Sequence, residues 1–337
     1  MQTLSQLMKV SEAQYRIFDM GRSVRKIDHT TFEKFENDEI PYPYPLQGHA
    51  WFALLFWSPQ QKQEHQIWFI KFPLDEQGLL KQSCRDDFLK RTLTEVAQQK
   101  EQASADINVQ QSENPWGFAP KQDKMATIHA KGSLAMGLAP SHFYQDVQTY
   151  LDAPVSDWQT LGVQGIADYC SRLEHDNNEQ RLVNALPKLT AELLLLLLPQ
   201  LENEVISHNL GKAIIDHFGQ SDDPMMMSAV IRALAQVKGD LLTDYVQHCL
   251  TSPCKNHVEI LVAISGRAWD VLADAAIALN YLEALADNDA GQQGFNHIIR
   301  DILQLPDIGP VVREAFRSEQ RSENLINRLG KFLKNVH

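Results

Sequence analysis

From about residue 155 onward, apolar residues recur with the period of an α-helix almost without interruption. The spacing i, i+4, i+7 places side chains on one helix face, and no alternating strand pattern intervenes. Two of these stripes are Ile206, Leu210, Ala213, Ile214 and Phe218, and then Met227, Val230, Ile231, Leu234 and Val237. A long run of one-sided helices buries its apolar faces by packing helix on helix, so this pattern predicts an all-helical half.

Short polar or proline-containing segments separate the stripes and leave helices of roughly 10 to 16 residues. An Asp, Ser or Asn ahead of a stripe can cap the free amides of a helix start. This spacing is typical of stacked helix pairs, but no strict repeated motif is present. We therefore predict an all-α helical array over residues 115–337, either a HEAT-like solenoid or an irregular helical domain. The separating segments are 221–224, 238–240, 252–253, Gly266, 287–291 and 306–307.

The first 100 residues mix short strands with helices. Residues 50–57 and 66–72 are aromatic and β-branched runs joined by a polar connector, 58–65, which predicts a hairpin. Residues 15–19 form a third candidate strand, and helices are expected near 3–10, 31–35 and 86–96. These runs predict a small α+β domain at 1–100. Its sheet should be antiparallel, because the hairpin connector is too short for a crossover helix. A polar linker or loop at 101–114 follows this domain.

Two segments of the sequence each allow two interpretations. The run Pro41-Tyr42-Pro43-Tyr44-Pro45 favours an extended path, either as a rigid connector packing its tyrosines on its own sheet or as a ligand for another protein's groove. The last predicted helix, 322–336, is amphipathic, with Arg328, Lys331 and Lys334 among its polar positions. It could dock on a membrane surface or an acidic partner, or simply cap the array.

Composition narrows the function classes. The formal net charge is −12, and residues 151–337 carry 15 Lys+Arg against 25 Asp+Glu. An acidic field repels phosphate backbones, so no nucleic-acid partner is expected. The strongest apolar run, 193–198, is far shorter than the roughly 20 residues of a transmembrane helix. Four cysteines without an apparent secretory signal favour free thiols and a cytoplasmic location.

The densest cluster of metal-ligand residue types is His248, Cys249, Cys254 and His257. Two thiols and two imidazoles could surround zinc, but the spacing is not a standard one. Cys249 also lies on an apolar stripe, so a buried structural thiol is the simpler interpretation. We therefore assign no metal, cofactor or catalytic residue from the sequence.

Other candidates have equally plain interpretations. His208 and His217, with Asp216, lie nine residues apart on one helix, which does not place two ligands on one face. The pairs Gly162/Gly165 and Gly291/Gly294 lack the flanking strand of a nucleotide-binding loop. Acid/base pairs could in principle form among Asp19, Asp28, His29, His49, Asp75, Asp86 and Asp87.

The stretches PYPYPLQGHAWFALLFW, IWFIKFPLDEQG and NPWGF resemble a bacterial family known only as a domain of unknown function. The resemblance spans most of the chain. It implies no activity and no site residues, and it agrees with a bacterial cytoplasmic setting.

The prediction for function is a non-catalytic interaction or scaffold protein that holds a protein partner on its helical array. The alternative is an enzyme, a hydrolase with a nonstandard Asp/His site at the junction of the two halves. Neither the partner's identity nor the oligomeric state follows from the sequence.

Overall fold

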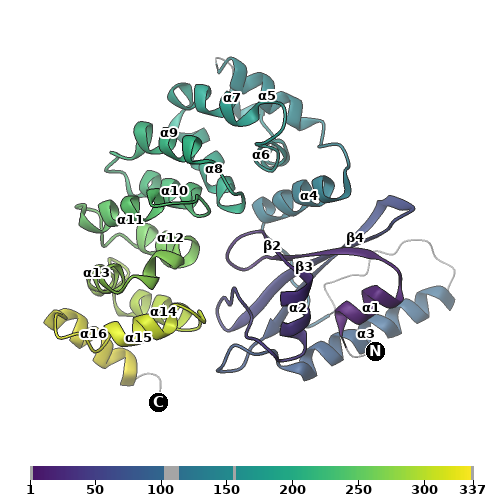
Figure 1. The fold of residues 1–337 in the computed structure, drawn as a ribbon, viewed down its shortest axis with the longest axis horizontal. Coiled ribbons are helices and arrows are strands. Elements are labelled where there is room, and N and C mark those ends of the chain that lie inside the picture. The colour runs from purple at the N-terminus through teal and green to yellow at the C-terminus, as the bar shows by residue number, and fades with distance from the viewer. Residues whose placement is uncertain (1–2, 102–113, 155–156, 335–337) are drawn as a thin grey trace. The chain divides into compact units, whose positions relative to one another are not determined.

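The computed structural model describes residues 3–101, 114–154 and 157–334 (Figure 1). The chain divides into two compact units, Met1–Lys124 and Met125–His337. The first unit contains the sheet, and the second is entirely helical among its described residues. This confirms the predicted fold class, a small α+β unit followed by a helical array. The predicted linker, 101–114, lies almost wholly outside the described residues.

The sheet of the first unit has four strands in the order β2-β1-β3-β4, and every neighbouring pair is antiparallel. Its elements are α1 (Leu4–Val10), β1 (Gln14–Asp19), β2 (Arg25–Ile27), α2 (His29–Glu36), β3 (His49–Ser58), β4 (Gln61–Pro73) and α3 (Gln82–Glu101). The pairing of β3 with β4, the last strand of this order, sets Phe52 opposite Ile70 and Leu54 opposite Trp68.

The predicted hairpin is present, but its predicted connector was wrong. β3 extends to Ser58 and β4 begins at Gln61, so the turn consists of Pro59 and Gln60 rather than residues 58–65. Residues 61–64 are exposed, so no apolar alternation marks them as strand. The short β2 was also missed, because three residues are too few to show a strand period.

The helices α1, α2 and α3 pack on one face of this sheet (Figure 1). Large aromatic side chains dominate the contact: Phe32 meets Phe52 edge-on at 5.1 Å, and Phe72 meets Phe88 at 5.9 Å between ring centroids. On the other face, Phe118 lies edge-on to Trp51 and Phe69. The aromatic run of β3 and β4 is therefore divided between the two faces, as strand alternation requires.

The proline–tyrosine run is a connector that packs on its own unit. Tyr42 is fully buried, its ring lies 5.0 Å from that of Phe35, and its hydroxyl lies 2.9 Å from a carboxylate oxygen of Asp19. The connector interpretation is therefore confirmed, and Tyr42 is not available to a groove in another protein.

The second unit contains helices joined by short turns. They are α4 (Gln122–Met136, which starts in the first unit), α5 (Phe143–Asp152), η1 (Trp158–Thr160), α6 (Val163–Cys170), α7 (Asn178–Ala185), η2 (Leu186–Lys188), α8 (Ala191–Gln200), η3 (Leu201–Asn203), α9 (His208–Phe218), α10 (Pro224–Leu234), α11 (Leu241–Thr251), α12 (Val258–Arg267), η4 (Trp269–Ala273), α13 (Ala275–Ala286), α14 (Gly291–Ile302), α15 (Gly309–Ala315) and α16 (Glu323–Lys334).

These helices form two rows (Figure 1). We call α6, α8, α10, α12, α14 and α16 the even row, and α5, α7, α9, α11, α13 and α15 the odd row. Each helix contacts the next helix of its own row, and the rows pack on each other through pairs such as α5 with α6 and α10 with α9 and α11. A helix inside such an array buries three sides and leaves one to solvent.

Helix starts in the array are capped as the sequence predicts. The side chains of Ser207, Asp223 and Asp274 accept hydrogen bonds from amides in the first turns of α9, α10 and α13. At the other end of the array, α16 buries Leu325 and Phe332 and packs on α13 and α14. Its apolar face is only partly covered within the unit, because Leu333 remains 55 % exposed. No helix in the described part of the chain has the length and apolarity needed to cross a bilayer.

Candidate interaction surface on the helical array

The cluster His248, Cys249, Cys254 and His257 does not form a ligand set. Cys249 is fully buried, and burial raises the pKa of its thiol to about 12. Cys254 directs its Sγ to the carbonyl oxygen of Asp222 at 3.3 Å, and His257 caps α12 by accepting from the amide of Glu259. Among the described residues, no group of three or more His, Cys, Asp or Glu side chains could hold a metal ion.

The acidic and histidine candidates of the first unit have separate structural partners. Each side chain has its own structural neighbours, and the described contacts bring no two of them together as an acid/base pair. Asp28 caps α2, Asp75 closes a turn onto the amides of Gln77 and Leu79, Asp86 pairs with Arg85, Asp87 pairs with Arg91, His29 stacks on Tyr15, and His49 lies 2.7 Å from the Gln47 carbonyl.

Asp19 differs from these residues because it is buried, with only 1 % of its surface exposed. Its carboxylate accepts hydrogen bonds from the amides of Arg22 and Ser23 and lies beside the Tyr42 hydroxyl. Desolvation raises the pKa of Asp19, although the Lys124 ammonium, the Tyr42 hydroxyl and loop amides favour the ionised form. The group closes the β1–β2 loop, which is a structural role.

A pH-dependent stability follows from Asp19. Because its pKa is higher in the folded than in the unfolded chain, its stabilising contribution is present at low pH and is lost as pH rises through the folded pKa. We expect the stability difference between wild type and Asp19→Asn to grow in favour of wild type as pH falls from neutrality toward 3.8, the ordinary pKa of an aspartate. Urea unfolding at several pH values measures it. Asp28→Asn is the control, because the pKa of Asp28 is lowered and titrates below this window. A difference in the free energy of unfolding between wild type and Asp19→Asn that does not change with pH would contradict this expectation.

The glycine pairs serve helix geometry. Gly162 is the residue before α6, and Gly165 lies where α6 meets the backbone of Phe143, at the start of α5. Gly291 has φ +69° at the start of α14, a conformation that favours glycine. On α9, the side chains of His208, Asp216 and His217 are exposed. Neither set forms a phosphate or catalytic site.

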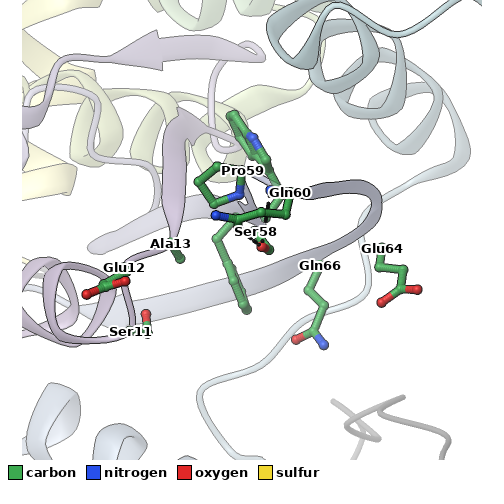
Figure 2. Close-up of a pocket in the computed structure, with 10 residues that line it drawn as sticks. Ser11, Glu12, Ala13, Ser58, Pro59, Gln60, Glu64 and Gln66 are labelled. Carbon is green, nitrogen blue, oxygen red and sulfur yellow. Dashed lines mark hydrogen bonds between the residues drawn. The ribbon is translucent and has the colours of Figure 1, made fainter.

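A shallow pocket of about 380 Å³ lies in the first unit (Figure 2). Figure 2 shows Ser11, Glu12 and Ala13 on one side, Glu64 and Gln66 on the other, and the hairpin turn between them. Ser11, Glu12, Pro59, Gln60 and Glu64 of its lining are exposed, whereas Trp57 is buried and its indole Nε1 has no hydrogen-bond partner among the described residues. The pocket is a hollow beside the hairpin turn, and we assign it no chemistry.

The even row exposes large apolar side chains on consecutive helices. Leu196 of α8, Met225 of α10 and Val262 of α12 are 46, 47 and 45 % exposed. In the described part of the odd row, Phe143 alone is such a residue, at 36 %. Because α10 packs between α8 and α12, the three residues lie on neighbouring helices of the even row. We call this surface the even-row face.

Acidic residues border the even-row face where its helices begin. Glu192 and Glu259 lie in the first turns of α8 and α12, and Asp223 caps α10. All three side chains are exposed. The helix dipole stabilises carboxylates at helix N-termini, and this effect alone explains the position of these three residues. They also give this edge of the face a negative charge that suits a partner with basic residues.

The other edge is fixed by residues 200–204, which we call the η3 hub. Thr127 and Lys131 of α4 bind Gln200 and Glu204, and Ser171, just after α6, binds Glu204. Arg232 of α10 and Arg267 of α12 place their Nε atoms 2.5 and 2.9 Å from the same oxygen of Glu202. The hub thereby joins four helices. It makes the even-row face a rigid platform rather than a set of independent helices.

Sequence reasoning missed both the face and the hub. Leu196 lies inside the predicted buried run 193–198, and Met225 precedes the stripe that begins at Met227. The available signal was apolar residues off the main stripe of their helix, at positions where a one-sided helix normally carries polar residues. The hub joins residues 30 and more apart in sequence, and no local pattern marks such pairs.

A family model described as Protein of unknown function (DUF3549) matches residues 1–333. No curated protein and no solved structure matches the chain.

Proposed function

Because the chain belongs to this family, Protein of unknown function (DUF3549), whose description names no activity, we propose a function from the residues alone. The protein is a scaffold whose even-row face binds a segment of a protein partner. The observation that supports this most is the line of exposed apolar side chains, Leu196, Met225 and Val262, on three adjacent helices. Apolar residues gathered on one surface of a soluble unit are characteristic of interaction sites.

The charge around the face defines the partner's chemistry. Glu192, Asp223 and Glu259 line one edge, so the bound segment carries apolar residues with Lys or Arg at the end that meets this edge. Stacked helices present such extended surfaces in repeat proteins, which supports a solenoid-like use of the array. We place this function in the cytoplasm, where the four free cysteines persist as thiols. Among the residues that the structure describes, no comparable group supports the hydrolase alternative.

The test is capture of a partner from the source cells with the tagged full-length chain. We expect wild type to retain one stoichiometric protein, and Leu196→Glu and Val262→Glu to reduce its recovery at least about tenfold, since a buried unpaired charge costs more than 1.4 kcal/mol. Gln247→Glu adds the same charge at an exposed site on α11 of the odd row and should leave recovery unchanged.

Two results would count against the proposal. One is a captured protein that both even-row variants retain, which would place its site elsewhere. The other is equal loss with Gln247→Glu, which would show a general charge effect. Circular dichroism of each variant establishes that the helices remain folded.

A further inference from the structure

The η3 hub leaves one positive charge in excess at the edge of the even-row face opposite the acidic residues. Its ion pairs join Lys131 to Glu204, and both Arg232 and Arg267 to Glu202. Two guanidinium groups thus share one carboxylate. Glu202 is 4 % exposed, whereas 29 and 22 % of the two arginine side chains remain exposed. The excess positive charge therefore lies on the two arginine side chains, which remain partly exposed to solvent.

The hydrogen-bond donors of the two arginines are only partly used. In the described part of the chain, Arg232 donates through its Nε to Glu202, and its Nη atoms have no partner. Arg267 places its Nε 2.9 Å from Glu202 without a hydrogen bond to it, and donates one Nη to the carbonyl of Gly266. A guanidinium has five N–H donors in a rigid fork that matches an oxyanion, so both side chains retain donors for a further ligand.

The shared carboxylate also positions the two cations for one ligand. Their Nε atoms lie 2.5 and 2.9 Å from the same oxygen, so the two nitrogens cannot be farther apart than the sum, about 5.4 Å. A carboxylate or phosphate group can bridge guanidinium groups at this separation. Holding them on Glu202 reduces the side-chain entropy that a bound anion would otherwise have to restrain.

We propose that Arg232 and Arg267 form an oxyanion-binding subsite that receives an acidic group of the bound segment, either a side-chain carboxylate or a C-terminus. The source of the ligand, a segment of a protein partner, rests on the proposed function. The anion-binding chemistry of the two arginines does not. The segment then has a fixed direction: its basic end meets Glu192, Asp223 and Glu259, its apolar residues cover the even-row face, and its acidic group reaches the arginines.

The test needs no partner. The full-length protein with ¹⁵N-labelled arginine is titrated with sodium phosphate and, separately, sodium acetate at constant ionic strength, and the Nε–Hε signals of Arg232 and Arg267 are followed. We expect both signals to shift together and saturate with each anion. Arg267→Gln should lower the anion affinity measured at the Arg232 signal about tenfold, because one charge-assisted hydrogen bond contributes about that much. Arg232→Gln should lower the affinity measured at the Arg267 signal by the same factor.

Each single variant leaves Glu202 one arginine partner, so the fold is retained. Arg300, an exposed arginine on α14, is the matched control: Arg300→Gln should change nothing. Signals that do not saturate, or that respond equally in the single variants, would overturn the subsite. A response to phosphate without one to acetate would overturn the partner carboxylate as its ligand.

The two proposals fail separately. If the anions do not bind but capture still depends on Leu196 and Val262, the subsite is wrong and the scaffold function stands. If the anions bind but no captured protein depends on those residues, the scaffold function is wrong and the subsite stands as a site for a small anion.

Discussion

Replacing Gly165 with valine should lower the free energy of unfolding of the helical unit by about 3 kcal/mol, a large value for overpacking. A Cβ atom at this position would lie 2.5 Å from the carbonyl oxygen of Phe143 and 2.9 Å from its carbonyl carbon. Both are backbone atoms, which cannot rotate away as a side chain can. The helices α5 and α6 would have to separate, and Gly165 therefore sets the distance between the two rows where the array begins. Urea unfolding of the full-length protein measures the effect.

Gly330 provides the matched control. It lies in α16, is exposed, and has no atom within 4 Å of the place that a Cβ would occupy. Alanine there should raise the free energy of unfolding by about 0.5–1 kcal/mol, because glycine is a poor residue for a helix interior. If Gly165→Val and Gly330→Ala changed stability in the same direction, the close approach of α5 and α6 would be contradicted.

Glu202→Ala should be comparably destabilising, by about 2–4 kcal/mol, because removing one partner of a buried ion pair leaves the other charges uncompensated. Glu202 is nearly fully buried, and its loss affects Arg232 and Arg267 together. The helices α10 and α12 would lose their common anchor to the segment that follows α8. The free energy of unfolding and the amide exchange rates of the even row measure the two consequences.

An exposed ion pair provides the comparison. Glu314 and Arg317 lie 3.5 Å apart with 76 and 79 % of their side chains exposed. Pairs of this kind contribute little to stability, so Glu314→Ala should leave the unfolding curve unchanged. Equal effects of Glu202→Ala and Glu314→Ala would mean that the hub does not hold the even row together.

The fold could be anticipated from local patterns wherever one side of an element is buried. The stripe from Ile206 to Phe218 became α9, and the capping residues Ser207 and Asp223 mark helix starts as expected. Prediction failed where an element has no contrast between a buried and an exposed side. Residues 61–64 of β4 are exposed, and β2 is only three residues long, so neither shows a period.

The candidate surface could not be anticipated because it depends on which helices become neighbours. Leu196 reads as one more buried leucine until α8 is placed beside α10. The cluster His248, Cys249, Cys254 and His257 illustrates the opposite case, because residues close in sequence do not converge. His248 stacks on Tyr245 within α11, Cys254 binds the carbonyl of Asp222, and His257 caps α12. The hub residues Glu202, Arg232 and Arg267 meet only through the packing of three successive even-row helices.

If the even-row face holds a protein partner, residue 262 should lie next to that partner in the cell. The most direct test is site-specific photo-cross-linking in the source cells, with a photoreactive amino acid at position 262 on the face and, as the control, at position 247 on the odd row. We expect one discrete cross-linked protein from position 262, abolished by Leu196→Glu, and none from position 247. The same adduct from both positions, or an adduct from 247 alone, would contradict this expectation.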